Sequence, residues 1–476
     1  MMNALFRRKP ITDDMNGDGK GPGLKRVLSA MDLTLLGIGA IIGTGIFVLT
    51  GHAAATQSGP AVVLSFVIAG LACAFAALAY AELAAMVGGC GSAYGYSYAA
   101  FGELIAWIIG WDLILEYGVS VAAVANGWSG YFNNALTAIG LGLPDYLTKG
   151  PFAEGGGGLV NLPAIAIILA LMFMLIAGVK QSAQLNAGMV MVKLLTIAVF
   201  VAIAVFNINP ENWSPFMPFG WFDTTADGKT IGVLAGASLV FFAYVGFDAV
   251  STAVEEARDP QNDVPKGILW SLGFCTIIYI VVSGLLTGIV PYGTLNVSSP
   301  VAHALQQLGY NWASALVATG VIFGLTTVML VLYYGLTRII VAISRDGLLP
   351  GFLGHVSPNT HTPVNVTIIT GLIMAVGAGF IPLGALAELV NIGTLAAFVL
   401  VCLGVIVLRK THPEYPRPYK MPGGTVLAWL GVFSCGALIA FLPFHTHMRF
   451  ILWLVAGLVI YFAYGMSRSR LAQQGA

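Results

Sequence analysis

The fold is decided by a glycine-rich apolar stretch near the N-terminus, residues 36–47, which reads LGIGAIIGTGIF. Four glycines, at positions 37, 39, 43 and 45, fall within nine positions of this stretch. Glycine costs about 1 kcal/mol relative to alanine inside a helix. The glycines suit either close packing of helices through small residues or an unwound stretch whose free amides and carbonyls line a cavity. We favour the unwound stretch.

A second stretch of the same kind, residues 241–252, reads FFAYVGFDAVST. It places Gly246 and Asp248 near the middle of an apolar run. A carboxylate at that depth needs a polar partner or a helix terminus. Asp248 would suit the start of a second half-helix, where it could cap free amides, or it could select basic side chains of a substrate. The sequence therefore predicts a broken helix here as well.

The composition places the chain in a membrane. It has 476 residues, of which 58% are hydrophobic and 9% are charged, whereas soluble domains carry about 25% charged residues. The polar residues are too few to cover a soluble protein, so the lipid bilayer is the expected surrounding. A formal net charge of zero disfavours nucleic acid as a partner. The five cysteines show no ligand spacing and are interpreted as apolar fillers, with no metal site expected.

Apolar runs of spanning length, roughly 17–25 residues each, recur about twelve times along the chain. The sequence therefore predicts an all-α membrane protein with about twelve transmembrane helices. Lys and Arg gather on the side that holds both termini, which places both termini in the cytoplasm. The predicted runs are 31–57, 61–87, 101–133, 161–178, 185–207, 231–255, 267–290, 311–343, 364–381, 386–408, 424–443 and 449–467.

The two glycine-interrupted runs are the first and the sixth. This spacing is expected if spans 1–5 and 6–10 are two inverted halves of one transport core, and such a matched pair points to a transporter's binding site. The predicted organisation is a cytoplasmic N-terminal segment (1–30), a ten-helix transport core (31–408, with halves 31–207 and 231–408), a cytoplasmic loop (409–423), two peripheral transmembrane helices (424–467) and a cytoplasmic tail (468–476).

Two broken helices that cross in mid-membrane would suit an amino acid. The N-terminus of a half-helix offers free N–H groups to a carboxylate, and the C-terminal end of another offers carbonyls to an ammonium. A channel would show a repeated filter motif or rings of charge. An intramembrane enzyme would show a metal motif or a nucleophile–base pair, and ATP-driven pumping would need a Walker A motif. The sequence has none of these, so a secondary transporter is predicted rather than an enzyme.

Three motifs resemble one transporter family. Residues 36–47 resemble the first-helix signature of the amino acid–polyamine–organocation (APC) superfamily. Residues 242–252, with Glu255-Glu256 and Asp259-Pro260 after them, look like the sixth helix of its cationic amino acid transporter branch. Residues 344–350, SRDGLLP, resemble the loop after that branch's eighth helix. The similarity covers about residues 24–465. It implies a bacterial inner (plasma) membrane protein with a leucine-transporter-like fold of ten core helices plus two.

The resemblance also implies a binding site for an L-amino acid. The substrate carboxylate would meet the backbone and side chains around Ile41, Gly43, Thr44 and Gly45. The α-amine would meet the carbonyls of Phe242, Ala243 and Val245, with Phe242 as a gate. Leu332 and Met329 on the eighth span are candidates for the side-chain pocket. A small neutral amino acid such as alanine, with wider acceptance that includes basic ones, is the expected substrate. A monomeric chain is compatible with these features.

Lys193 stands alone in the apolar run VMVKLL, residues 190–195. It lies too deep in the fifth span to snorkel to the interface, and an intramembrane lysine is a functional hypothesis by default. Burial disfavours the charged amine, so Lys193 could gain and lose a proton. The resemblance implies that it binds carbonyls of the first break in place of sodium, with a proton as the coupling ion and no cofactor. Thr326-Thr327 resembles the hydroxyl pair of a sodium site, so sodium symport and amino acid exchange stay open.

The remaining charged residues in and near the spans are assigned to proton coupling, structural hydrogen bonds or salt bridges. Glu116 is a second candidate for proton coupling. Glu82, Glu103 and Asp112 are expected to make structural hydrogen bonds. A cytoplasmic salt-bridge cluster that closes the inner gate is expected from Glu255, Glu256, Arg258 and Asp259.

Overall fold

The computed structural model describes residue 7 and residues 26–87, 92–153, 156–178, 183–225, 230–358 and 362–474. Within these residues, eight helices are long and apolar enough to cross a membrane, and four shorter apolar helices accompany them. Each predicted span overlaps one of these twelve segments. The chain is therefore a multi-pass α-helical membrane protein, as predicted. The inverted pairing of its two halves stays a prediction.

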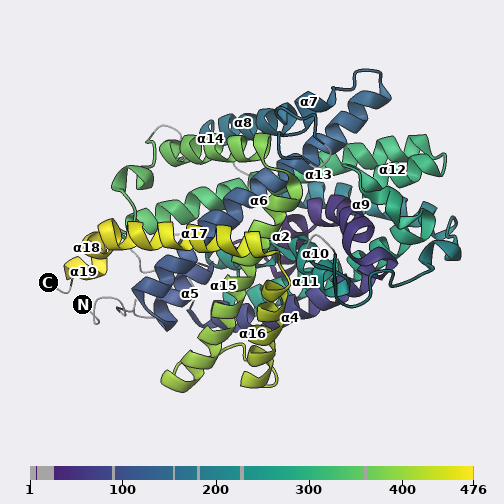
Figure 1. The fold of residues 1–476 in the computed structure, drawn as a ribbon. Helices are drawn as coiled ribbons and strands as arrows, with labels where there is room; N and C mark the ends of the chain where they lie inside the picture. Colours follow the sequence, from purple (N-terminus) through teal and green to yellow (C-terminus); the bar gives the residue numbers. More distant parts are fainter. Residues whose placement is uncertain are drawn as a thin grey trace.

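The elements follow one another along the chain with few long loops (Figure 1). The first half comprises α2 (Ala30–Ile41), η2 (Gly45–Leu49), α3 (Thr50–Ala53), η3 (Ala54–Ser58), η4 (Gly59–Ala61), α4 (Val62–Val87), α5 (Ser92–Ala100), α6 (Glu103–Ala138), α7 (Asp145–Thr148), α8 (Leu162–Ile176), α9 (Ala183–Val205) and η5 (Pro210–Trp213).

A two-residue strand pair, β1 (Asp223–Thr224) and β2 (Thr230–Ile231), lies in the connection to the second half and was not predicted. The second half comprises α10 (Val233–Val240), η6 (Phe241–Tyr244), η7 (Phe247–Glu256), α11 (Pro260–Ile289), η8 (Tyr292–Leu295), α12 (Pro300–Gln307), α13 (Asn311–Arg345), η9 (Gly351–Gly354), α14 (Val364–Phe380), α15 (Leu383–Thr411), α16 (Thr425–Ala440), α17 (Phe444–Ile460), η10 (Tyr461–Gly465), α18 (Met466–Arg468) and α19 (Arg470–Gln474).

The first span is interrupted where its glycines cluster. Helix α2 starts with a capping box formed by Ser29 and Asp32 and ends at Ile41. Ile42 has an extended backbone, with ψ at 98°, and the chain becomes helical again by Gly45, as a π-helix. The predicted interruption of the first span is therefore confirmed.

The sixth span is interrupted in the same way. Helix α10 passes through the 3₁₀ turn η6 and ends at Val245, and Gly246 then adopts φ +116°, a conformation that glycine reaches without steric cost. The following segment, η7, is a 3₁₀-helix rather than the expected α-helix. The hydroxyls of Ser251 and Thr252 donate to the carbonyls three residues earlier, Asp248 and Ala249, at 2.6 and 2.7 Å, which agrees with the tighter winding.

The broken spans lie among the longest helices. Helix α6 packs along α13 and α15, and α11 packs along α4 and α2. At 36 residues α6 is about 54 Å long, well beyond a bilayer core of about 30 Å. Figure 1 shows α7 and α12 at one end of the molecule and α18 and α19 at the other. The sequence predicted the length of α6 and α13 but not the short helices α5 and α12.

Glu82 has the structural role that the sequence predicted. Its carboxylate is 1% exposed and accepts two hydrogen bonds from the guanidinium of Arg409 on α15, at 2.9 and 2.5 Å. The backbone N–H of Met421 donates to the same carboxylate at 2.8 Å, and Arg417 lies 3.6 Å away. This two-pronged contact fixes the end of α4 to the end of α15 and to the loop that follows it.

Arg409→Lys is expected to destabilise the protein by about 1 kcal/mol, because a lysine keeps the charge but loses one of the two parallel hydrogen bonds. The measurement is thermal unfolding in detergent, with the neighbouring exposed Lys410→Arg as the control. Equal melting temperatures for Arg409→Lys and the parent would show that the second hydrogen bond between Arg409 and Glu82 contributes nothing to stability.

Glu103 also has a structural role. It accepts hydrogen bonds from the hydroxyls of Tyr98, Tyr461 and Ser469, at 3.2, 3.1 and 2.5 Å. These contacts tie the start of α6 to the C-terminal segment that follows α17. The prediction of a structural hydrogen bond at Glu103 is confirmed.

Two described members of the predicted cytoplasmic salt-bridge cluster, Glu256 and Arg258, have partners outside it. Glu256 lies 3.9 Å from Arg338 on α13, and Arg258 donates to the carbonyl of Val27 at 2.9 Å. The reason is the backbone: Leu28 and Ala257 form a parallel β-bridge, so residues 256–258 bind the segment before α2 through main-chain hydrogen bonds. The side chain of Glu255 lies outside the described residues.

Candidate functional site

The two broken spans touch at their interruptions. A Cβ atom added to Gly45 would lie 2.2 Å from the Cα of Ala243, so only glycine permits this approach. A Cβ atom at Gly246 would lie 3.1 Å from the backbone of Ala40. The residues that the sequence selected separately from two distant stretches therefore lie side by side.

A tyrosine that the sequence analysis missed connects the two breaks. The hydroxyl of Tyr279 on α11 lies 2.8 Å from the carbonyl of Ile41, the last residue of α2, and 2.8 Å from the carbonyl of Ala243 in η6. The side chain is fully buried. A tyrosine in an apolar run must find an acceptor for its hydroxyl, and that requirement was the available signal in residues 274–283.

Tyr279→Phe is expected to raise the KM for substrate about 2- to 10-fold. This is the effect of losing one hydrogen bond of about 0.5–1.5 kcal/mol, because the hydroxyl that fixes the position of one break relative to the other is removed. Initial uptake rates in proteoliposomes measure this effect. Tyr461→Phe is the control, since it removes an equally buried hydroxyl that bonds Glu103 instead. An unchanged KM in Tyr279→Phe would show that substrate binding does not depend on the contact of Tyr279 with the two breaks.

The candidate substrate-binding residues are all buried in the structure. The carbonyls of Ile41 and Ala243 share the one hydroxyl proton of Tyr279, and that of Phe242 accepts from the N–H of Val245 at 3.2 Å. Each carbonyl has two lone pairs, so each keeps room for a further donor. Among the described residues, the hydroxyl of Thr44 has no hydrogen-bond partner although it is buried at the break. An unpaired buried hydroxyl is costly and suits a ligand that binds here.

The side-chain pocket is less well defined. Leu332 and Met329 are buried on α13, as a pocket requires. The α13 residue nearest to the first break is Val328, whose side chain would be 3.6 Å from a Cβ atom at Gly43. Val328 therefore joins Leu332, one helical turn further on, as a candidate for contact with the substrate side chain.

Lys193 reaches the first broken span. Its amine donates to the carbonyl of Gly39 at 2.6 Å, two residues before the end of α2, and the side chain is 1% exposed. Its methylene groups pack on Gly324 of α13, where a Cβ atom would lie 2.9 Å from Cγ of the lysine. In the part of the chain that the structure describes, no carboxylate pairs with the amine; the thiol of Cys275 on α11 is the ionisable group that interacts with it. Lys193 thus bridges α9, α2 and α13.

The two threonines that resemble a sodium site are already hydrogen-bonded. Thr326 donates to the carbonyl of Ile322 at 2.8 Å and accepts from the indole of Trp128 at 3.0 Å. Thr327 donates to the carbonyl of Gly324 at 2.8 Å. The stem of Lys193 packs on the same glycine, so the lysine fills space between α2 and this part of α13.

The acidic residues of the core gather on α6 and η7. Glu116 interacts electrostatically with Asp112 and with Asp248, and all three are buried. Asp248 lies in the first turn of η7, as predicted, and its Oδ2 accepts from the hydroxyl of Tyr117 at 3.3 Å, while no side chain of the described residues bonds its Oδ1. The Oδ1 of Asp112 faces Gly393 of α15 and has no hydrogen-bond partner among the described residues, so the structural hydrogen bond predicted for Asp112 is not found at this atom.

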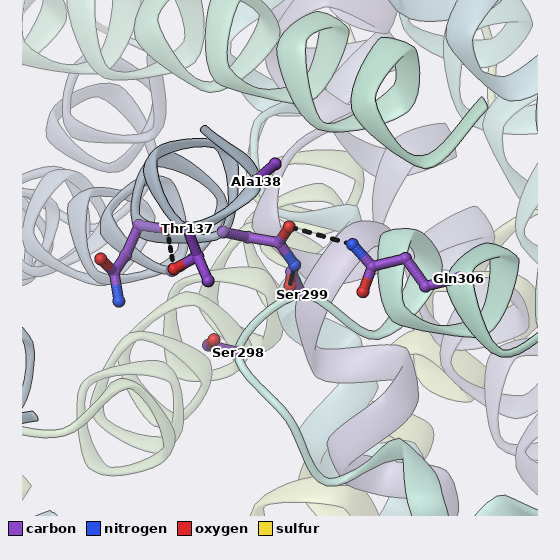
Figure 2. A pocket seen from close by; sticks show the side chains of 8 residues that line it. Thr137, Ala138, Ser298, Ser299 and Gln306 are labelled. Carbon is purple, nitrogen blue, oxygen red and sulfur yellow. Dashed lines mark hydrogen bonds between the residues drawn. The ribbon is translucent and has the colours of Figure 1, made fainter. Parts of the chain in front are cut away.

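A separate polar cavity of about 310 Å³ lies where the C-terminal end of α6 meets α12 (Figure 2). Gln306 reaches across it and donates to Asn134 at 3.4 Å, and Asn134 donates to Ser299 at 2.8 Å. The cavity belongs to the end of the molecule opposite to α18 and α19 (Figure 1). None of the residues selected from the sequence lines it. Its lining residues are Gly130, Asn133, Asn134, Thr137, Ala138, Ser298, Ser299 and Gln306.

The sequence of this chain is similar to those of known transport proteins. The chain is 49% identical to the branched-chain amino acid permease BcaP of Bacillus subtilis (strain 168) over 475 residues, 99% of this chain and 100% of the relative. It is 46% identical to the methylthioribose transporter of the same organism over 470 residues, again 99% and 100%. It is 38% identical to cationic amino acid transporter 4 of Homo sapiens over 434 residues, 88% of this chain and 65% of the relative. The amino acid permease family model matches residues 28–464, so the chain belongs to the amino acid permeases of the APC superfamily.

Proposed function

We propose that this protein imports L-amino acids across the plasma membrane, the bacterial inner membrane, by proton symport with alternating access. The two broken spans bind the substrate: the free backbone groups at residues 41–45 take its carboxylate, and the carbonyls of residues 242–245 take its amine. Both termini face the cytoplasm. No cofactor takes part besides the proton.

The observation that carries the proposal is the contact between Lys193 and Gly39. The amine binds the last turn of α2 at 2.6 Å without a carboxylate partner among the described residues. A lysine in this position holds α2 most strongly while it is charged, because a hydrogen bond from an ionised donor is about twice as strong as one from a neutral donor, and burial disfavours its charge. Loss of the extra proton therefore weakens the hold on the end of α2 next to the substrate. Glu116 is the second group proposed to handle protons.

Sodium symport and exchange remain the competing mechanisms. The contacts of Lys193 with α2 and α13, and the existing partners of the Thr326 and Thr327 hydroxyls, favour the proton. Exchange without net proton flow uses the same broken helices and is distinguished by transport measurements alone.

A neutral aliphatic amino acid is the proposed substrate, from alanine up to the branched-chain ones. The candidate pocket residues Val328 and Leu332 are apolar and buried. The first relative above is named for branched-chain amino acids, and others are named for cationic amino acids and methylthioribose. A basic substrate would place its cation near Asp248, whose Oδ1 has no side-chain partner among the described residues.

The test is uptake of labelled alanine, leucine, lysine and methylthioribose into proteoliposomes under an inward proton gradient, an inward sodium gradient, or neither. We expect accumulation of a neutral amino acid above equilibrium with the proton gradient alone. Accumulation that follows sodium instead, or uptake that requires preloaded amino acid, would replace the symport proposal by the corresponding alternative.

A further inference from the structure

Helix α6 contacts the first broken span just after its interruption, through two residues one helical turn apart. Gly127 and Tyr131 are four positions apart on α6, so they lie on the same face of the helix. Gly127 faces Thr44: a Cβ atom added to the glycine would lie 2.5 Å from Cγ2 of the threonine and 2.9 Å from its Oγ1. The hydroxyl of Tyr131 donates to the carbonyl of Phe47 at 2.8 Å. Thr44 and Tyr131 are both fully buried.

The segment that α6 contacts has an uncommon backbone conformation. Thr44 directly precedes η2, a π-helix in which the N–H of Thr50 bonds the carbonyl of Gly45, five residues earlier. Single π-helical turns are rare and frequently lie at functional sites. The hydrogen bond from Tyr131 reaches Phe47 in the middle of this turn. Helix α6 therefore holds the start of the second half of the first span at its backbone, while Gly127 leaves room for the side chain of Thr44.

Both contacts act on the position of the Thr44 hydroxyl. Among the described residues this buried hydroxyl has no hydrogen-bond partner. A hydroxyl left unpaired in a buried place costs free energy, and a carboxylate oxygen of a substrate would pair it. Threonine is β-branched and has few alternative side-chain orientations. A side chain at position 127 would therefore displace the hydroxyl, and loss of the bond from Tyr131 would release the turn that follows it.

We propose that Gly127 and Tyr131 are positioning residues for the substrate carboxylate, which act through Thr44 and make the site select ligands with a free carboxylate over the corresponding amides. A hydrogen bond to a carboxylate is charge-assisted and about twice as strong as one to a neutral acceptor. Correct placement of the Thr44 hydroxyl is therefore worth more for an amino acid than for its amide. This inference rests on the proposed function, because it assigns the substrate carboxylate to residues 41–45.

The experiment is binding of labelled L-alanine to the purified full-length protein, in competition with unlabelled L-alanine or L-alaninamide. Tyr131→Phe should weaken the binding of alanine about 2- to 10-fold, the effect of one hydrogen bond, and change the affinity for alaninamide less. The ratio of the two affinities should therefore fall. Tyr333→Phe is the control, because it removes an equally buried hydroxyl that donates to a helix carbonyl elsewhere, that of Thr367 on α14.

A second variant tests the contact of Gly127 with Thr44 by rescue. Gly127→Ala should weaken alanine binding about tenfold, because the added methyl group overlaps the threonine. Thr44→Ser removes the methyl group nearest to the new Cβ and keeps the hydroxyl, so the double variant should bind alanine as Thr44→Ser alone does. Thr44→Val keeps the overlap and should not rescue Gly127→Ala. Gly118→Ala, also on α6, is the control, since the nearest atom there is 3.7 Å away on Leu336.

The two variants decide the inference together. Equal losses of alanine and alaninamide affinity in Tyr131→Phe would show that the tyrosine only supports the fold and would overturn the positioning role. A double variant that binds alanine no better than Gly127→Ala would overturn the role of the Gly127 contact. If the parent binds alanine and both α6 variants match it, this inference alone fails. If the parent binds no alanine, the proposed function fails and this inference with it.

Discussion

Lys193→Ala is expected to lose proton-driven accumulation of substrate completely. A gradient of one pH unit stores about 1.36 kcal/mol per proton, which supports about tenfold accumulation at one proton per substrate. Without the amine, nothing couples the proton to the end of α2 through the carbonyl of Gly39. The inside-to-outside ratio of labelled substrate in proteoliposomes should then fall to the equilibrium value, with or without the gradient.

Packing must be separated from coupling in this experiment, because the lysine stem also packs on Gly324. Lys193→Met keeps a flexible apolar side chain of similar length and removes the charge, so it should lose the gradient effect as fully as Lys193→Ala. Substrate counterflow should persist in Lys193→Met, which shows that the protein is folded. Lys149→Ala, at an exposed ion pair with Asp145, is the control and should behave as the parent. If Lys193→Met accumulates substrate as the parent does, the proposal of proton symport through Lys193 is wrong.

Gly45→Ala is expected to be the most destabilising single-methyl addition in the site. The new Cβ would lie 2.2 Å from the Cα of Ala243, a main-chain atom that cannot move without shifting η6. Overpacking of a buried contact costs about 1–3 kcal/mol and sometimes more, and here the two broken spans would be forced apart. We expect a marked drop in the melting temperature and in the yield of folded protein, with transport abolished.

Gly43→Ala is the matched control for this substitution. It adds the same methyl group two residues earlier in the same break, where the nearest atom is 3.6 Å away on the side chain of Val328. Its melting temperature should stay near that of the parent, whatever its effect on substrate binding. If Gly43→Ala and Gly45→Ala unfold at the same temperature, the close approach of the two broken spans is not what makes Gly45 necessary.

The expected roles of the charged residues show where sequence reasoning succeeds. Glu82 and Glu103 lie near the ends of their spans, where partners from loops and neighbouring helices are available, and both make the predicted structural hydrogen bonds. Asp112 was grouped with them but faces a glycine on α15. The partner of a buried carboxyl depends on which residue of a distant helix lies opposite, and the spacing along α6 does not contain that information.

The sequence by itself determined the class of the protein, the approximate positions of its apolar helices and the positions of both breaks. It could do so because hydrophobicity and glycine content act locally: a bilayer selects apolar runs, and glycine weakens a helix where it stands. Lys193 was found for the same reason, since a single charge in an apolar run is visible without knowing its partner.

The tertiary structure decided everything that depends on two distant stretches meeting. The hydroxyl of Tyr279 lies within 2.8 Å of the carbonyls of both Ile41 and Ala243. Lys193 donates to Gly39, and Ala257, directly after η7, pairs with Leu28. Each of these contacts joins residues more than 30 positions apart. Short-range preferences place a residue on a helix, but only the packing of helices fixes which carbonyl or glycine it meets.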